Sequence, residues 1–292
     1  MIKIIIDSGS DTSAWLEANY DYGFIPLSLA IEGKTYLDHI DIQTSELIEK
    51  MKAGIVPKTS QVSPGVAQEV IEGYRQQGHD VLYISIWKEL SGTYSVINQI
   101  KAEYAESHPE FNIAVVDSLS GSVAGTNIAI QAMELANKGA SFAEVVAHAE
   151  EVAQATKIFL TVNDMSWLVK GGRLPKAVGV VGTALNVKPI LTVNDHEIYN
   201  AGLVRGQKRV YKRLVQEMQK AAGDFTDQLF LISHVDQEEA ANTLAEQIRE
   251  NIPGSQTAIF EFGSVLATHI GIGGLAVACL NHKPENYQYI QQ

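Results

Sequence analysis

The chain has 292 residues, of which 46% are hydrophobic and 19% are charged, and its formal net charge at pH 7 is -12. This length and composition predict a well-packed globular protein, with two ordinary domains favoured over one large domain. The acidic balance disfavours a non-specific nucleic-acid surface, which needs dense Lys and Arg, and also electrostatic docking onto anionic lipid headgroups. A lipid ligand would therefore be held one molecule at a time, inside a cavity.

The single cysteine, Cys279, excludes an intrachain disulfide and a cysteine-rich zinc site. Its neighbours 275–278 are apolar, which favours a small buried hydrophobic side chain over a reactive thiol. The N-terminal apolar run reaches Asp7 too early for a signal-peptide core, and no apolar run approaches the ~18 residues that a membrane span needs. We therefore expect a cytoplasmic protein without stable membrane insertion.

Short apolar segments alternate with helical patterns in the first half of the chain. Residues 2–6 predict a buried strand, and the polar run 7–11 that follows indicates a turn and a helix N-cap. The same order recurs, with further strands expected at 81–86 and 111–116. Helices are expected at about 94–106, after Asp117-Ser118 as far as about Asn137, and at 142–154. This alternation predicts a parallel sheet covered by helices on both faces.

The second half is less regular. Expected strands lie at 158–162, 189–193, 197–199, 228–234 and 258–262, and expected helices at 164–170, 210–222 and 238–251. The residues Asn194-Asp195-His196 lie between two of these strands and are typical of a hairpin turn.

The two halves together predict an α/β protein of two units. Residues 1–155 form the first unit, with a parallel sheet flanked by helices, and residues 156–292 form a second, mixed α/β unit. The unit with which the segment 57–77 packs is not decided by the sequence, because the segment can pack with the second unit as well as with the first.

In the first unit, small hydroxyl residues follow one loop and one expected strand. Thr59 and Ser60 follow a loop marked by Gly and Pro, and Ser91-Gly92-Thr93 follows an apolar strand. Ligands of parallel sheets bind at the carboxyl ends of strands, and the free N–H groups of a helix N-terminus suit an anion. The alternative for each residue is ordinary helix capping.

A histidine stands in a glycine-rich segment near the C-terminus. His269 follows an apolar stretch and is itself followed by Gly271, Gly273 and Gly274. Such glycines let the backbone approach a ligand or another chain segment closely, and the alternative for the histidine is a core side chain bonded to a carbonyl. The spacing fits no dinucleotide fingerprint, and no Walker A sequence is present.

A further candidate is the arginine in Lys170-Gly171-Gly172-Arg173. The two glycines are expected to end a helix and to leave Arg173 on a loop. An arginine in that position can pair with a carboxylate or a phosphate. The alternative is an ordinary surface charge.

These segments together resemble the DegV family, whose members include the fatty-acid-binding subunits of bacterial fatty acid kinase. The matching pieces occur in family order and span almost the whole chain: Asp7-Ser8, Thr59-Ser60-Gln61, Leu90-Ser91-Gly92-Thr93-Tyr94, Asp117-Ser118, Lys170-Gly171-Gly172-Arg173, Lys188-Pro189-Ile190-Leu191, Val204-Arg205 and His269-Ile270-Gly271-Ile272-Gly273-Gly274. The chain departs from the family pattern at Trp87, where relatives often have a small residue, and at Val62, where a proline is common. Both departures bear on the shape of the pocket.

The resemblance implies two α/β domains with a long-chain fatty acid buried between or beneath them. It implies that Thr59 and Ser91 hold the carboxylate with His269 beside them, and that Ser60, Gly92 and Thr93 belong to the same ligand-binding turns. A separate ATP-dependent kinase subunit then phosphorylates the acid, and Arg173 serves the phosphate or the kinase contact. The chain itself is expected to be a carrier without a catalytic residue, a cofactor or a metal.

Elementary energetics are compatible with a lipid ligand. Moving ~14 methylenes out of water contributes up to about 11 kcal/mol, before the cost of association. The carboxylate must be hydrogen-bonded, because an unpaired buried charge is costly. Apolar residues expected to line the cavity are Ile84, Ile86, Val123, Phe159, Phe262 and Leu266.

Two other functions stay open at this point. The ligand can be another amphiphilic anion, for which the head-group reasoning holds unchanged. A serine hydrolase would use Ser91 as nucleophile, His269 as base and Asp117 to orient it, although Ser91 lacks the G-x-S-x-G elbow. Kinase activity in this chain is not expected, and Asp7 and Asp11 are interpreted as turn and capping residues.

Overall fold

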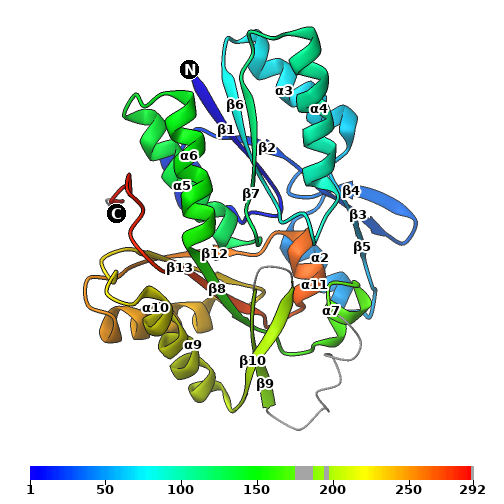
Figure 1. Ribbon diagram of the computed structural model, residues 1–292. Coiled ribbons are helices and arrows are strands. Elements are labelled where there is room, and N and C mark those ends of the chain that lie inside the picture. Colours follow the sequence, from blue (N-terminus) through cyan, green and yellow to red (C-terminus); the bar gives the residue numbers. More distant parts are fainter. Residues whose placement is uncertain (175–186, 194–196, 291–292) are drawn as a thin grey trace.

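The structure, a computed structural model, describes residues 1–174, 187–193 and 197–290 (Figure 1). The expected turn Asn194-Asp195-His196 lies outside these residues. The strands on either side of it are β9 (Val187–Val193) and β10 (Ile198–Arg205), and they pair antiparallel, with Ile198 opposite Val193. The expected pairing of these two strands is therefore confirmed.

The first sheet is parallel throughout and has the strand order β2-β1-β6-β7. Its strands are β2 (Gly23–Ile25), β1 (Ile2–Asp7), β6 (Asp80–Ser85) and β7 (Ile113–Asp117). The inner strands are buried almost end to end, because helices cover both faces of the sheet. Figure 1 shows these helices as two pairs: α3 (Pro64–Gln76) with α4 (Thr93–Ser107), and α5 (Val123–Asn137) with α6 (Phe142–Ala155).

The second sheet is mixed and has the order β10-β9-β8-β13-β11-β12; of its neighbouring strand pairs in the described residues, β11 and β12 run parallel and the others antiparallel. Its remaining strands are β8 (Thr156–Thr161), β11 (Leu229–His234), β12 (Gln256–Glu261) and β13 (Leu275–Leu280). Helices α9 (Gln207–Ala222) and α10 (Glu238–Asn251) pack on it. The predicted α/β class, a parallel sheet followed by a mixed unit, is confirmed.

The C-terminal strand β13 was not expected from the sequence. It inserts between β8 and β11, so the last segment of the chain completes the middle of the sheet. Cys279 lies on this strand and is fully buried, and burial raises the pKa of its thiol to about 12. The cysteine is thus a small buried side chain with little thiolate character.

Several short elements before residue 64 were also missed. They are the helix α2 (Thr44–Lys52) and a small antiparallel sheet of order β4-β3-β5, which consists of β3 (Ser28–Ile31), β4 (Lys34–Leu37) and β5 (Lys58–Ser60). The helix indicated after the polar run 7–11 is present as α1 (Ala14–Asn19). Three-residue strands such as β5 are too short to show a period. Thr59 therefore lies in a strand opposite Leu29, and not at the helix N-terminus that the sequence suggested.

Helix α5 is shared between the two sheets. It packs against β1 and β6 of the first sheet and against β8, β11 and β13 of the second. Of its 15 residues, 12 are buried. A helix covered on both sides needs no polar face, and the sequence of α5 shows almost none. The strands of the first sheet end at Asp117 and those of the second begin at Thr156. The division into units at 155–156 stays a prediction.

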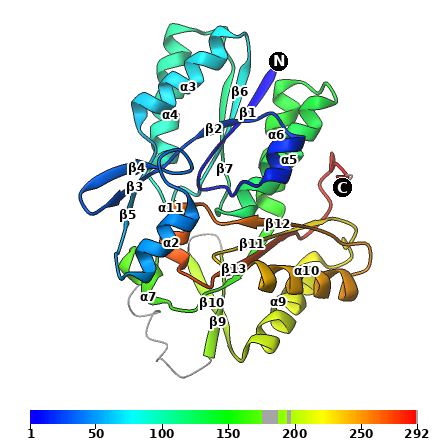
Figure 2. The same ribbon diagram turned by 180° about the vertical axis from the view of Figure 1, so that it is seen from behind.

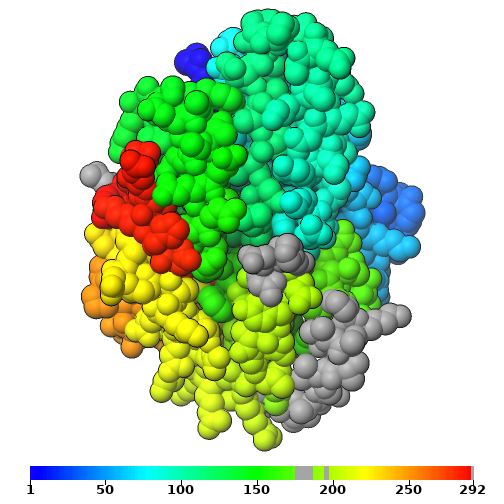
Figure 3. Space-filling view, viewed as in Figure 1, coloured from blue at the N-terminus to red at the C-terminus, as the bar shows by residue number. Residues whose placement is uncertain are grey.

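The C-terminal segment around Tyr287 and Gln288 contacts both α5 and β11. Gln288 and Gln131 exchange two hydrogen bonds, each through a main-chain group of Gln288, and the Tyr287 hydroxyl accepts from the Leu229 N–H at 3.3 Å. In Figure 3 this red segment lies across the boundary between the green α5–α6 pair and the yellow part of the second unit. The segment therefore contacts a helix that packs on the first sheet and a strand of the second sheet.

Candidate ligand-binding site

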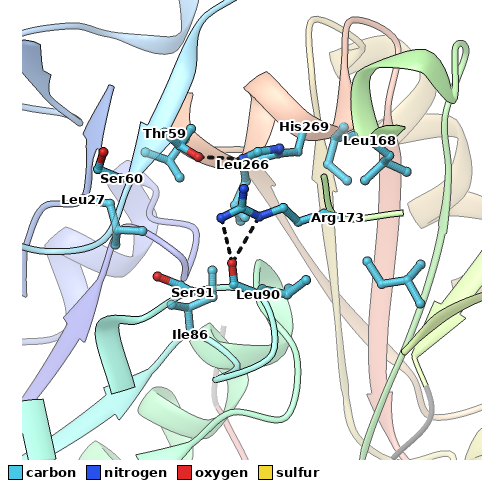
Figure 4. A pocket seen from close by; sticks show the side chains of 13 residues that line it. Leu27, Thr59, Ser60, Ile86, Leu90, Ser91, Leu168, Arg173, Leu266 and His269 are labelled. Atoms are coloured by element: carbon cyan, nitrogen blue, oxygen red, sulfur yellow. Dashed lines mark hydrogen bonds between the residues drawn. The ribbon is translucent and has the colours of Figure 1, made fainter. Parts of the chain in front are cut away.

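A small cavity of about 60 Å³ lies where β5, the β6–α4 turn, α7 (Ser166–Lys170) and α11 (Ser264–Ile270) meet (Figure 4). Among the described residues, the lining is mostly aliphatic and includes five residues with hydrogen-bonding side chains. The aliphatic residues are Leu27, Ile86, Leu90, Leu168, Ile198, Val265, Leu266 and Ile270, and the other five are Thr59, Ser60, Ser91, Arg173 and His269. The fold thus brings five of the seven expected site residues to one cavity.

The centre of the site is a contact between the two halves of the chain. Thr59 Oγ1 and His269 Nε2 lie 2.8 Å apart, although 210 residues separate them in sequence. Burial, and to a smaller extent the nearby Arg173 guanidinium, lowers the pKa of His269 from 6.5 to about 4. The imidazole is therefore neutral at neutral pH and offers one donor and one acceptor.

The other ring nitrogen of His269 has no hydrogen-bond partner within the described part of the chain. It faces Gly171, where a Cβ atom would come within 2.0 Å of Nδ1. The missing side chain of Gly171 is thus what leaves room for the ring.

Ser91 is held by the turn that joins β6 to α4. The Trp87 carbonyl accepts the N–H groups of Leu90 at 2.9 Å and Ser91 at 3.2 Å. Ser91 Oγ lies 2.9 Å from Thr93 Oγ1, which in turn accepts the Val62 N–H at 3.3 Å. Hydrogen bonds to the main chain and to a buried threonine therefore fix the hydroxyl at the cavity wall.

The two remaining candidates, Gly92 and Thr93, do not line the cavity. Thr93 is fully buried. At Gly92 a Cβ atom would come within 1.9 Å of Gln61 Oε1, so this glycine accommodates a neighbouring side chain. Val62 and Trp87, the two departures from the family pattern, are buried and do not line the cavity either.

Arg173 is bound to the main chain and does not project freely from its loop. Its Nε and Nη2 donate to the Leu90 carbonyl at 3.1 and 2.9 Å, and its Nη1 donates to the Gly171 carbonyl at 2.7 Å (Figure 4). Burial lowers the pKa of the guanidinium from its ordinary value. Because an arginine has five N–H groups, donors remain for a ligand at the cavity.

Two of the six apolar residues expected to line the ligand cavity lie at this small cavity. Ile86 and Leu266 line the cavity, whereas Ile84, Val123, Phe159 and Phe262 do not. Ile84, Val123 and Phe262 are buried core residues, and Phe159 packs toward the α9–α10 side of its sheet. The sequence indicates which side chains are buried, and the sheet packing decides which cavity they face.

The glycines after His269 serve packing between chain segments. Gly271 and Gly273 have φ values of +77° and +88°, and Cβ atoms there would collide with Trp167 and Asn163. Of the two explanations considered for these glycines, close approach of another chain segment is therefore the one the structure supports.

Comparison with known proteins identifies the family. The protein-family model described as "Uncharacterised protein, DegV family" matches residues 1–282 of this chain. A DegV domain-containing protein of Clostridium perfringens (strain 13 / Type A) is 32% identical over 285 residues, which is 97% of this chain and 98% of that protein. The chain belongs to the DegV family.

Solved DegV structures have the same fold. A DegV family protein of Thermus thermophilus, described as fatty-acid-binding, superposes with a TM-score of 0.85 at 26% identity, covering 95% of this chain and 98% of that one. The fatty acid kinase (Fak) B3 protein of Streptococcus pneumoniae, loaded with linoleic acid, gives a TM-score of 0.85 at 26% identity and covers 96% and 99% of the two chains.

The geometry of this DegV chain does not form a hydrolase triad. The hydrogen bonds of Ser91 Oγ go to Thr93, and His269 Nε2 is paired with Thr59. Asp117 Oδ1 accepts the N–H of Leu119 in its own turn. The hydrolase arrangement of Ser91, His269 and Asp117 is therefore absent from the described residues.

Neither a metal site nor a membrane span is found in the described residues. No group of three or more His, Cys, Asp or Glu side chains there is arranged to hold a metal ion. Among the helices placed by the structure, none has the length and apolar character needed to cross a bilayer.

Proposed function

We propose that this DegV protein binds a long-chain fatty acid and holds its carboxylate between Thr59, Ser91 and His269. The observation that carries the proposal is the Thr59–His269 pair at 2.8 Å in a cavity whose other walls are mainly aliphatic. Hydroxyls and a neutral imidazole can donate to a carboxylate without neutralising it. One carboxylate oxygen then stays available for a further reaction.

The relatives support this choice of ligand. Besides the linoleate-loaded Fak B3 protein, a protein of Eubacterium ventriosum described as stearic-acid-binding matches with a TM-score of 0.87 at 25% identity, covering 95% of this chain and 97% of that one. A ligand class that recurs among proteins of the same fold and family favours a fatty acid over another amphiphilic anion.

The size of the cavity indicates which part of the ligand it can hold. A volume of about 60 Å³ corresponds to roughly two water molecules, enough for a carboxylate. A hydrocarbon chain needs several times this space, so this cavity suits the head group and the acyl chain must extend beyond it.

Protein purified from cells is expected to carry fatty acid, detected by native mass spectrometry and identified after organic extraction. Thr59→Val, which keeps the shape and removes the hydroxyl, should weaken binding of palmitic acid by about 10-fold, as should Ser91→Ala, because each removes one hydrogen bond to a charged group. Thr35→Val on the exposed part of β4 is the matched control. Protein that refuses added fatty acid, or a Thr59→Val variant with unchanged affinity, would contradict the proposal.

We further propose that a separate ATP-dependent kinase subunit phosphorylates the bound acid, with Arg173 at the transferred phosphate. Its positive charge and remaining N–H donors suit a phosphoryl group. Because Arg173 also holds the Leu90 carbonyl beside Ser91, it links the reacting end to the binding turn.

Arg173→Ala is expected to retain most fatty-acid affinity while acyl-phosphate formation by the kinase subunit falls by about 100-fold. The two quantities are measured on the same samples, by equilibrium binding of the acid and by ATP-dependent acyl-phosphate formation. Arg173→Lys, which keeps the charge without the planar fork, should fall between the wild type and Arg173→Ala. Parallel losses of binding and phosphorylation would show that Arg173 acts only through the Leu90 turn.

A further inference from the structure

The helix that carries His269 is capped by a buried aspartate from the first half of the chain. Asp38 Oδ1 accepts the Ser264 N–H at 3.0 Å, and Asp38 Oδ2 accepts the Val265 N–H at 3.0 Å. These are the first two N–H groups of α11, and Asp38 is fully buried. A carboxylate at a helix N-terminus satisfies donors that have no partner inside the helix and complements the helix dipole.

The main chain of the same residue is bonded to the opposite wall of the site. The Asp38 N–H donates to the Leu27 carbonyl at 3.0 Å, and Leu27 lines the cavity. The next residues form β3, in which Leu29 is paired with Thr59 of β5. Asp38 therefore connects the strand pair that carries Thr59 with the helix that carries His269.

The segment before α11 is held to the first half of the chain by two more side chains. Thr44 Oγ1 donates to the Phe262 carbonyl at 2.9 Å, and the Gly263 N–H donates to Asp11 Oδ1 at 3.3 Å. Figure 2 shows α2, which begins at Thr44, lying beside α11. Among these contacts, only the one from Asp38 reaches the first turn of the helix itself.

We propose that Asp38 is a positioning residue that sets His269 at bonding distance from Thr59, and so sets the preference for a carboxylate head group. The helix α11 has seven residues and is about 10 Å long, so a shift of its first turn is transmitted to its last. This inference rests on the proposed function. Asp38 does not line the cavity, and its effect on the ligand is entirely through α11 and β3.

The test compares two ligands that differ only at the head, palmitic acid and hexadecanol. In the wild type the acid is expected to bind more tightly than the alcohol. In Asp38→Asn, whose amide accepts from only one of the two N–H groups, the acid is expected to lose about 10-fold in affinity while the alcohol is almost unaffected. Asp38→Ala should reduce the preference further.

Ser141→Ala is the matched control, because it removes a helix cap with a capping box at the distant α6. It should lower thermal stability and leave the acid-to-alcohol ratio unchanged. Equal losses for acid and alcohol in Asp38→Asn would show a purely structural role and overturn the inference. The absence of acid preference in the wild type would instead overturn the proposed function, so the two failures are distinguishable.

A spectroscopic readout covers the case in which Asp38→Ala does not fold. The imidazole nitrogen NMR signals of His269 in ligand-free Asp38→Asn should shift, because the bond with Thr59 lengthens. Signals identical to those of the wild type would contradict the positioning role.

Discussion

Gly171→Ala is expected to weaken fatty-acid binding by about 100-fold, because it displaces a head-group residue by direct collision. A Cβ atom at this position would lie 2.0 Å from Nδ1 and 2.6 Å from Cε1 of His269. The backbone itself tolerates alanine, since Gly171 has φ and ψ of -74° and -9°. The His269 ring must therefore move, and its bond with Thr59 is lost.

The effect is measured as the dissociation constant of palmitic acid, together with the melting temperature of each variant. Gly73→Ala is the control, because Gly73 lies within helix α3 and a Cβ atom there would meet nothing within 4 Å. That control should gain roughly 0.5–1 kcal/mol of stability and bind normally. Wild-type affinity in Gly171→Ala would show that His269 is not needed at its observed position.

Asp11→Asn is expected to change the pH dependence of folding by about 4 kcal/mol between about pH 4 and pH 7. Asp11 is fully buried, and burial raises the pKa of its carboxyl from 3.8 to about 7, although hydrogen bonds from Ser122 and the Gly263 N–H favour the ionised form. Between these two pKa values the folded protein keeps a proton that the unfolded chain has released. The contribution of Asp11 to stability is therefore complete below its unfolded pKa and declines as the pH rises toward 7.

The measurement is the free energy of unfolding against pH for both proteins. The advantage of Asp11→Asn over the wild type should grow by about 1.4 kcal/mol for each pH unit in this window. The difference isolates Asp11, because buried histidines such as His269, whose pKa is lowered, oppose the trend equally in both proteins. Asp224→Asn, at an exposed site, should leave the curve unchanged. A constant difference between the two curves would contradict an Asp11 that titrates near neutrality.

The fold was largely predictable where the chain has long periodic segments. The isoleucine-rich run of β1 and the apolar run of β6 are recognisable as strands, and helices of 15 residues follow β6 and β7. This alternation suffices to predict a parallel sheet. The small sheet was missed because Lys58-Thr59-Ser60 carries no pattern, and β13 was missed because the glycine-rich segment before it resembles a loop. Such elements are defined by their partners and not by their own residues.

The residues of the candidate site were predictable only where the sequence carries a local signal. Thr59, Ser91, Arg173 and His269 were found by their order along the chain, and the cavity contains all four. Asp38 was missed, since an isolated aspartate in a loop has no local signal and its role depends on a helix that begins 226 residues later. Asp7 stabilises its own turn, as expected, through the Gly9 N–H, whereas the N-cap of α1 is Ser13 and not Asp11. Contacts at this range depend on the tertiary structure.

The shared helix α5 also limits how the chain can be divided. With 12 of its 15 residues buried between β1 and β6 on one side and β8, β11 and β13 on the other, this helix supplies interior to both halves. A fragment cut at the end of α6 would expose the face of α5 that the second sheet covers and would lose the C-terminal segment that anchors Gln131. A designer who wishes to exchange one half between relatives must therefore exchange α5 with both of its surfaces matched, because the helix cannot be assigned to a single module.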